Sequence, residues 1–415
     1  MTKIKNIGLI GFGVVGEGVY HVINNTPSLN TRIKRIGIKH FHKTRNAPQK
    51  LFTTDINSII YDNEIDTIVE LIDDADIAYE IVRQSLRNKK NVVTANKRML
   101  AYHLPELIKL QRENKVSLLY EAAVCGSIPI LRNLEEYYNN DLLQSIKGVV
   151  NGSTNFILTQ MCEKNISYGE ALAKAQESGF AESNPALDVE GFDAQNKLTL
   201  LLKHTFGIEV HPDEIFKKGI TSITSEDMQY AKEKNLAIKL IAKAYYNNNQ
   251  EIVTYVIPQF VSKENQLAHV NNEYNGVLIG SLLADEQFLY GKGAGRYPTA
   301  SAVLSDISAL NYDYKYEYKK SFLKNSAVLD CRAIVNVYVS WKNGSVIDKN
   351  IFEDISTEFV SEGNNYLIGK ISLEKLSCLA ELHDVSIIEA DGQANSKTVL
   401  SPLVFAKSKS ETSRI

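Results

Sequence analysis

Cysteine is scarce in this chain of 415 residues, and the four that occur lie far apart, at Cys125, Cys162, Cys331 and Cys378. No two of them form a CxxC pair, which argues against a disulfide framework and against a cysteine-ligated zinc site. The eight histidines show no metal-ligand spacing either. We therefore expect free thiols and no transition-metal site.

Long hydrophobic runs and an excess of one charge are also missing. No apolar stretch approaches the roughly 18 to 20 residues that span a bilayer, and the N-terminus has no signal-peptide core, so we expect a cytoplasmic protein with no membrane contact. Lys and Arg total 46 against 49 Asp and Glu, a net charge of -3. This balance offers no basic field for nucleic acid. The length of 415 residues predicts two or three domains.

What the chain does contain begins with a glycine pattern. Residues 6–18 read NIGLIGFGVVGEG, an apolar run followed by Gly11, Gly13 and Gly16. In a strand–turn–helix unit that binds a dinucleotide, the first glycine permits the tight turn and the second lets backbone approach the pyrophosphate. The third lets the helix pack on the strand. The predicted cofactor contacts on this turn are Gly11, Phe12, Gly13, Val14, Val15 and Gly16. The alternative is a glycine-rich turn without a ligand.

The order of predicted elements indicates the fold class. The N-terminal region alternates helix-like stretches with apolar runs at residues 4–10, 33–38, 67–72, 91–95 and 117–122. Such alternation predicts an α/β domain, a doubly wound, Rossmann-like parallel sheet, in residues 1–130.

Later segments have a different texture. Residues 131–310 mix helical and strand-like stretches, which predicts a middle α+β domain for substrate binding, catalysis and dimerisation. Strand-like runs at residues 333–341, 366–371 and 385–389 predict a small C-terminal α+β domain in residues 321–415. Residues 312–320 read as a charged, aromatic connector. We expect a returning segment near residues 296–320 to complete the dinucleotide-binding domain.

The end of the second predicted strand bears on the choice of cofactor. Domains that select NAD carry an acidic residue there, which binds the ribose 2′-hydroxyl. This chain instead offers Lys39, His40, Lys43 and Arg45. Positive charge suits the extra phosphate of NADP. We therefore predict NADP(H) as the preferred cofactor and NAD(H) as the alternative, while a solvated basic loop would explain the same residues without a ligand.

Five further blocks carry charges, amides and glycines. They are TANK (94–97), EAAVCGSIP (121–129), NGSTNF (151–156), GFAESNPALDVEGFDAQNK (179–197) and GKGAGRYPTASA (291–302). In this order, together with GFGVVGEGV, they closely resemble homoserine dehydrogenase over roughly residues 4–310. The resemblance implies reversible, nicotinamide-dependent interconversion of L-aspartate 4-semialdehyde and L-homoserine, on the route to threonine, methionine and isoleucine. It also implies a homodimer or higher homo-oligomer through the middle domain.

Two lysines are the candidate catalytic residues. Asp193 and Lys197 lie four positions apart in a predicted helix and share one face. On an ordinary helix this pair would be a solvated ion pair. The resemblance implies that Lys197 is an acid/base group and that Lys97, near the cofactor, is a second catalytic lysine. Two lysines on one oxygen would depress each other's pKa. The alternative for Lys97 is a surface lysine.

The same resemblance implies further binding residues. The carboxylates of Glu182 and Asp193 would hold the substrate ammonium or the catalytic lysine, with Asp188 as another partner. The cofactor contacts would also include Lys39, Thr94, Lys97 and Gly295. The stretch 121–128 resembles a monovalent-cation site, in which the Glu121 carboxylate and backbone carbonyls face Na⁺; the ligands would be Glu121, Val124, Gly126 and Ile128. The alternative is a structured turn at an interdomain hinge.

The chain also departs from the family pattern. Asp73 and Asp74 stand where the family commonly has small residues near the cofactor, and Tyr297 is bulky beside the second glycine loop. The last 95 or so residues resemble nothing in the minimal family core, and an ACT-like ligand-sensing module is one interpretation. The alternatives to the leading prediction are a related dehydrogenase with a shifted substrate and a catalytically impaired, nucleotide-binding paralogue that senses metabolites.

Overall fold

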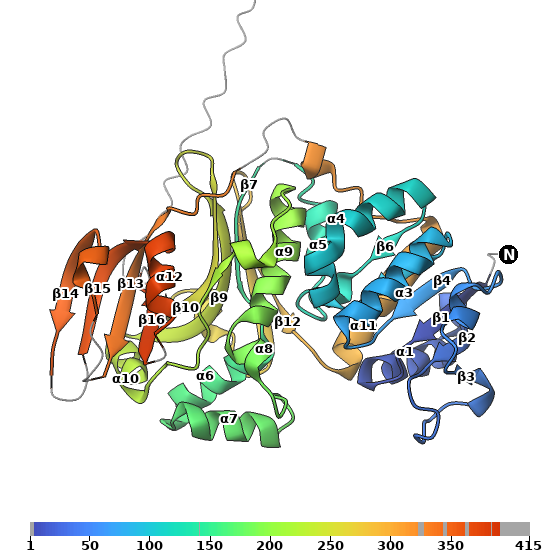
Figure 1. The fold of residues 1–415 in the computed structure, drawn as a ribbon, viewed down its shortest axis with the longest axis horizontal. Coiled ribbons are helices and arrows are strands. Elements are labelled where there is room, and N and C mark those ends of the chain that lie inside the picture. Colours follow the sequence, from blue (N-terminus) through green and yellow to red (C-terminus); the bar gives the residue numbers. More distant parts are fainter. Residues whose placement is uncertain are drawn as a thin grey trace, which may run out of the picture.

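Two β-sheets, joined by helices between them, make up the computed structural model of this chain (Figure 1). The structure describes residues 4–140, 142–322, 328–342, 347–361, 365–382 and 384–390. None of the helices in these residues is long and apolar enough to cross a membrane.

The first sheet has six strands in the order β3-β2-β1-β4-β5-β6, and each neighbouring pair is parallel. This confirms the predicted doubly wound sheet, whose strand order reverses between β1 and β4, the place where such folds bind ligands. The strands are β1 (Lys5–Ile10), β2 (Thr31–Gly37), β3 (Phe52–Thr53), β4 (Thr67–Glu70), β5 (Asn91–Thr94) and β6 (Leu118–Leu119). The helices of this part are α1 (Val14–Asn25), α2 (Asn57–Ile60), α3 (Ala75–Arg87), α4 (Lys97–Asn114) and α11 (Arg296–Ala309).

The second sheet follows the order β12-β11-β7-β9-β10-β16-β13-β15-β14, and β8 pairs with β10 beside this path. Its strands are β7 (Leu143–Val149), β8 (Phe216–Lys217), β9 (Leu236–Tyr246), β10 (Ile252–Ser262), β11 (Tyr274–Ser281), β12 (Asp285–Lys292), β13 (Ile334–Trp341), β14 (Asp354–Phe359), β15 (Asn365–Ser372) and β16 (Val385–Glu389). The accompanying helices are α5 (Ile130–Glu135), α6 (Gly152–Lys164), α7 (Tyr168–Glu177), α8 (Ala186–Val189), α9 (Phe192–Phe206), α10 (Ser225–Glu233) and α12 (Leu373–Ala380).

The middle and C-terminal strands share this one sheet. The three strands predicted near the C-terminus are present as β13, β15 and β16, and β14 adds a fourth. However, β16 pairs in parallel with β10 through Gln259 and Glu389, so the C-terminal strands extend the middle sheet. Pairing between strands more than a hundred residues apart leaves no local sequence signal.

The segment predicted as a connector is packed into the protein. The rings of Tyr316 and Tyr318 are fully buried and lie against His204 of α9. Lys320 is also buried, and its Nζ donates hydrogen bonds to the carbonyls of Leu134 (2.6 Å) and His204 (2.7 Å). From Tyr314 onward, alternate residues of the run YDYKYEYKK therefore face the protein interior and the residues between them face solvent, whereas Tyr312 is exposed.

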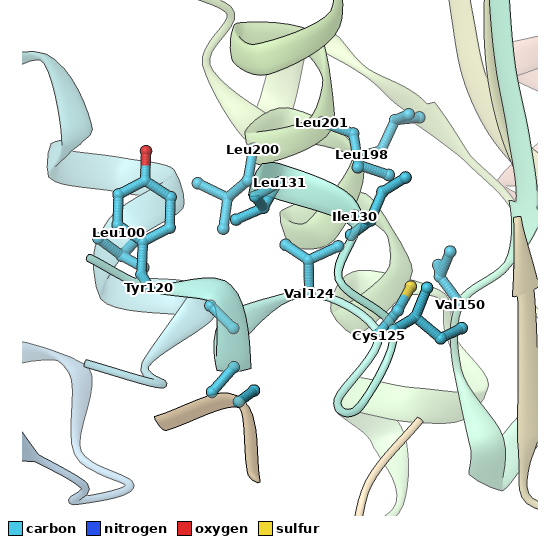
Figure 2. Packing of buried hydrophobic residues seen from close by; sticks show 14 of the residues in the cluster. Leu100, Tyr120, Val124, Cys125, Ile130, Leu131, Val150, Leu198, Leu200 and Leu201 are labelled. Carbon is cyan, nitrogen blue, oxygen red and sulfur yellow. The ribbon is translucent and has the colours of Figure 1, made fainter. Parts of the chain in front are cut away.

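Helix α9 lies between the two sheets (Figure 1). Every residue from Asp193 to Phe206 is buried, because the helix packs on α4 and α5 on one side and on β7, β9 and β10 on the other. Figure 2 shows Leu198, Leu200 and Leu201 of this helix in one cluster with Leu100 of α4 and Leu131 of α5. A helix held from both sides can place side chains at the junction of the two sheets.

Candidate active site

The glycine turn after β1 has the geometry that a dinucleotide requires. Gly11 has φ +100°, and a Cβ there would lie 2.4 Å from the carbonyl oxygen of Leu71. A Cβ at Gly16 would lie 2.2 Å from the Gly11 carbonyl oxygen, whereas one at Gly13 would meet nothing within 4 Å. The turn is thus closed at Gly11 and Gly16 and open at Gly13, where α1 begins and its N-terminal amides attract a phosphate. The residues present fit a dinucleotide.

The other predicted contacts on this turn differ in what they offer. Phe12 packs edge-to-face against Phe52 at 5.2 Å between ring centroids, so its ring belongs to the domain core. Val15 is half-buried, and Val14 is exposed at the first position of α1. A ligand at this turn would therefore meet backbone at positions 12 and 15, and the side chain of Val14.

The basic segment after β2 is partly engaged with itself. The Arg45 guanidinium donates hydrogen bonds to the carbonyls of His40 (2.7 Å) and Lys43 (2.8 Å) and lies 5.5 Å from the ring centroid of Phe52. Residues 41–45 line a hollow of about 320 Å³ that also includes Phe52. Lys39, two residues before this lining, is exposed.

The TANK block joins β5 to α4. The Thr94 hydroxyl donates to the buried Glu70 carboxylate at 2.5 Å, and the Asn96 side chain caps α4 by accepting from the Met99 N–H at 3.0 Å. Lys97 is consequently the first residue of α4 and lies at the carboxyl end of the parallel sheet. The Thr94 hydroxyl is therefore buried and bonded to Glu70.

The two aspartates that depart from the family pattern follow β4. Asp74 caps α3 by accepting hydrogen bonds from the N–H groups of Asp76 (3.1 Å) and Ile77 (3.0 Å). A capping carboxylate stabilises the positive end of a helix, which gives Asp74 a local structural reason. Asp73 is exposed. Its charge adds a little to the raised pKa of Glu70, which comes mainly from burial, and to that of Lys97, which comes mainly from Asp193.

Asp193 brings the two predicted catalytic lysines together. One carboxylate oxygen lies 2.9 Å from Lys97 Nζ, and the other lies 2.7 Å from Lys197 Nζ. The side chains of Lys197 and Asp193 are only 9% and 5% exposed, while that of Lys97 is 41% exposed. Because Lys97 comes from α4 and Asp193 from α9, this ion-pair cluster spans the junction between the two sheets, and solvent reaches it through Lys97.

The carboxylate between the lysines alters the expected electrostatics. Burial alone would raise the pKa of Asp193, but the ammonium groups of Lys197 and Lys97 and hydrogen bonds from Lys197 and Asn151 outweigh it. They hold that pKa well below its ordinary value. The Asp193 charge in turn raises the pKa of Lys97 against the effect of burial. The expectation that two adjacent lysines would lower each other's pKa is therefore wrong for Lys97, because Asp193 lies between them.

The remaining predicted substrate carboxylates separate into two cases. Asp188 belongs to α8, and its Oδ1 accepts a hydrogen bond from Asn151 Nδ2 at 2.7 Å, which links it to Asp193. Glu182 is exposed on the loop between α7 and α8, and in the described residues no contact joins its carboxylate to the cluster. The structure gathers Asp188 but leaves Glu182 at the surface.

In the predicted cation loop, the Glu121 side chain is bonded to the next helix. Both carboxylate oxygens of Glu121 accept backbone N–H groups at the start of α5, from Leu131 (2.8 Å) and Arg132 (2.8 Å). Burial, with the nearby Asp306 charge, raises the Glu121 pKa to about 8. The side chain thus bonds to the start of α5, and its contact with a cation stays a prediction.

The backbone of the same loop turns sharply. Cys125 and Gly126 have φ of +56° and +53°, and the N–H of Ser127 bonds to the Lys292 carbonyl at 3.0 Å. Figure 2 shows Cys125 and Val150 at one edge of the buried cluster. In the described residues no group of three or more His, Cys, Asp or Glu could hold a metal ion, so a cation here would depend on backbone oxygens.

The second glycine loop ends at Gly295, with φ +119°, immediately before α11. Helix α11 packs against α1, where Arg296 lies 3.3 Å from Glu17. The returning segment therefore contacts the first helix of the glycine turn, and Gly295 lies at the start of that contact.

Sequence reasoning missed two residues that hold Lys197. Lys197 Nζ donates to the Val150 carbonyl at 2.6 Å, and Asn275 Nδ2 donates to the same oxygen at 2.9 Å. Asn151, noted only as part of a block, bridges Asp188 and Asp193. The Asn before a helix signals a cap, but no local pattern reveals contacts with α8, α9 and β11.

A glycine turn fitted to a dinucleotide, in a doubly wound sheet, and a cluster of two lysines and an aspartate at its edge are together typical of a nicotinamide-dependent oxidoreductase. The comparisons specify the family. The NAD-binding domain of homoserine dehydrogenase matches residues 11–121, and the homoserine dehydrogenase domain matches residues 129–308. The chain belongs to the homoserine dehydrogenase family.

Individual relatives agree with this. The homoserine dehydrogenase of Bacillus subtilis is 33% identical over 383 residues, which cover 88% of this chain and 87% of that protein. That of Lactococcus lactis is 38% identical over 315 residues, 73% of each chain. A crystal structure of a homoserine dehydrogenase from Thiobacillus denitrificans has a TM-score of 0.82 at 27% identity and covers 93% of this chain and 98% of its own. These similarities establish an oxidoreductase acting on the CH–OH group, and they give no support to a paralogue that has lost catalysis.

Proposed function

We propose that Lys97 and Lys197 are the catalytic pair of this homoserine dehydrogenase and that Asp193 holds them on the reacting oxygen. The single observation that carries the proposal is the Asp193 carboxylate with one ammonium at 2.9 Å and the other at 2.7 Å. The bound nicotinamide supplies or accepts the hydride. An ammonium beside the substrate carbonyl stabilises the developing alkoxide and then protonates it, which typically contributes about 10² to 10⁴-fold to rate.

The two lysines divide this work. The raised pKa of Lys97 keeps its ammonium charged at neutral pH, which suits electrostatic stabilisation of the alkoxide from the exposed side of the cluster. Lys197 is more deeply buried, and we assign to it the proton transfer, to the alkoxide in reduction and from the homoserine hydroxyl in oxidation. We assign substrate-ammonium binding to Asp188 and, on the adjoining loop, to Glu182.

A lysine on the same helix provides a matched control. Lys197→Met should lower kcat for L-homoserine oxidation with NADP by about 10² to 10⁴-fold, measured by the absorbance of the reduced nicotinamide. Lys203→Met also removes a buried ammonium from α9, but one whose partner is Glu209 at 2.8 Å, and it should retain catalysis. Wild-type kcat in Lys197→Met would refute the assignment.

We also propose that NADP(H) is preferred. Lys39, Lys43 and Arg45 put positive charge after β2; Lys43 and Arg45 line the hollow of about 320 Å³, and Lys39 is exposed at the start of the same segment. No carboxylate stands in this run to select the NAD ribose. Arg45 is already bonded to two carbonyls of its loop; it therefore stiffens the loop, and Lys39 and Lys43 supply the phosphate contacts.

We further propose a monovalent-cation site, Na⁺ by preference, built from backbone oxygens of Glu121, Val124, Gly126 and Ile128. The consecutive positive φ angles at Cys125 and Gly126 support it, since such a turn directs successive carbonyls to one side.

We also propose three domains: a dinucleotide-binding domain of residues 1–130 completed by residues 296–320, a middle domain of residues 131–310 and a C-terminal domain of residues 321–415. The middle domain would form the interface of a homodimer. Strand β12 supports the dimer: it ends the ten-stranded sheet, and Tyr290 on it is half-exposed and stacked on Tyr274. An open, aromatic sheet edge is typical of a surface that a partner covers. Sedimentation analysis measures the assembly directly.

A further inference from the structure

The turn between β7 and α6 contacts the catalytic cluster twice. The carbonyl of Val150 accepts hydrogen bonds from Lys197 Nζ at 2.6 Å and from Asn275 Nδ2 at 2.9 Å. The next residue, Asn151, is 4% exposed and lies against Asp193. This short turn therefore holds both members of the Asp193–Lys197 ion pair.

The hydrogen bonds of Asn151 fix the orientation of its side-chain amide. Its Oδ1 accepts from the backbone N–H of Thr154 at 2.8 Å and from the Thr154 hydroxyl at 3.0 Å. The opposite end of the amide must then be the NH₂ group, and its two hydrogens go to Asp188 Oδ1 and Asp193 Oδ2, each at 2.7 Å. One neutral group thus donates to two carboxylates at once.

This arrangement solves an electrostatic problem. Asp188 and Asp193 are held within hydrogen-bond reach of the same nitrogen, and two negative charges so close repel each other. A donor between them offsets that repulsion, and Asn151 adds to the effects of Lys197 and Lys97 on the ionised form of Asp193. An acceptor in the same place would increase the repulsion.

We propose that Asn151 is a positioning residue for the reaction, fixing Asp193 between Lys97 and Lys197 and tying Asp188 to the same centre. The inference rests on the proposed roles of the two lysines. Asn151 touches neither lysine; it acts on them through the Asp193 carboxylate.

Asn151 is also the N-cap of α6, and its effect must be separated from helix capping. Asp and Ser cap helices about as well as Asn, because each offers an oxygen to the N3 amide. Asp offers no donor, and the single hydroxyl hydrogen of Ser cannot serve both carboxylates. Asn151→Asp and Asn151→Ser therefore keep the cap and remove the bridge, and only the first adds a negative charge beside Asp188 and Asp193.

The test compares these variants by kcat, KM and the pH dependence of kcat/KM for L-homoserine. Asn151→Ser should lower kcat by about 10 to 100-fold, the worth of hydrogen bonds to charged groups. Asn151→Asp should lower it further and move the acidic limb of the profile to higher pH, because a third carboxylate beside the cluster favours the protonated form of its lysines. Ser167→Ala, which removes the cap of helix α7 and touches none of the cluster residues, should leave both the rate and the profile unchanged.

Several outcomes decide between the explanations. Wild-type kcat and pH profile in Asn151→Ser would overturn the inference, and this variant decides alone if Asn151→Asp does not fold. A lower thermal stability with unchanged kinetics would reduce Asn151 to a cap and also overturn it. Lys197→Met and Lys97→Met are measured in parallel: normal activity in both refutes the lysine roles themselves, whereas inactive lysine variants beside normal Asn151 variants refute only the positioning role.

Discussion

Replacing Asp193 with Asn removes the one negative charge that the two lysines share. The two side chains are nearly isosteric, so packing around α9 is preserved while the counter-charge is lost. The oxygen of the introduced amide could still accept hydrogen bonds, but its NH₂ group would face a donor in either orientation. At the Oδ1 position it would face the Lys97 ammonium, now at 2.9 Å, and at the Oδ2 position it would face both the Lys197 ammonium and the NH₂ of Asn151, now at 2.7 Å each. The variant therefore leaves a buried ammonium without a counter-ion.

The expected loss of stability in Asp193→Asn follows from how deeply each of the two ion pairs is buried. Removing one partner of a buried ion pair costs about 3 to 5 kcal/mol, whereas an exposed pair is worth about 0 to 1 kcal/mol. Lys197 is 9% exposed and Lys97 is 41% exposed, so the loss of the Asp193–Lys197 ion pair accounts for most of the change in stability. We expect a loss of about 3 kcal/mol in the free energy of unfolding, the low end of the buried range, since one acceptor oxygen remains.

The pH dependence of this loss has a definite sign. The folded-state pKa of Asp193 is depressed, so the ion pairs contribute stability above the unfolded pKa of about 3.9, and this contribution is lost as pH falls through the folded value. The difference in the free energy of unfolding between wild type and Asp193→Asn should therefore be largest at pH 7 and become smaller as the pH falls into the acidic range.

Urea unfolding at pH 7 and kinetics with L-homoserine and NADP measure both effects. We expect kcat to fall by at least about 10²-fold, because the lysines lose the group that orients them. Asp227→Asn is the control. It alters another fully buried aspartate, which accepts hydrogen bonds from the Ser340 hydroxyl and the Thr224 N–H, and it should reduce the free energy of unfolding without changing kcat. A loss below about 1 kcal/mol with a normal kcat would refute the reasoning, since that is the size of an exposed pair.

Three further predictions concern protonation, cofactor choice and the cation. Burial raises the pKa of Glu70 to about 7, so between about pH 4.5 and 7 the Glu70 carboxyl binds a proton in the folded state but not in the unfolded state. The free energy of unfolding should therefore fall as pH rises through this range, by up to about 1.4 kcal/mol per pH unit. Urea unfolding at several pH values should show that Glu70→Gln reduces this dependence on pH. Lys39→Glu should raise KM for NADP by about tenfold and change that for NAD little, and equal effects on both would contradict the phosphate role. Replacing Na⁺ with tetramethylammonium at constant ionic strength should lower activity reversibly; unchanged activity after exhaustive exchange would count against the backbone site.

Local patterns carried much of the fold and part of the site. Glycine spacing predicted the turn after β1, because a tight turn and a close helix–strand contact each need a missing side chain at a fixed offset. The i, i+4 spacing placed Asp193 and Lys197 on one face of α9. Burial periodicity was less informative for residues 312–320, whose charges hid the two-residue alternation of Tyr316 and Tyr318.

The sequence by itself determined the class of chemistry: a dinucleotide turn, the lysines and carboxylates, and an ordered set of blocks that a single family shares. Only the tertiary structure decided that Asp193 reaches Lys97 across the junction of the two sheets, that Asn151 bridges two carboxylates, and that Glu121 bonds to the start of α5. The physical reason is range. Turns, caps and helix faces depend on neighbours within a few residues, whereas these contacts depend on how separate elements pack, and packing is set by buried surfaces distant in the chain.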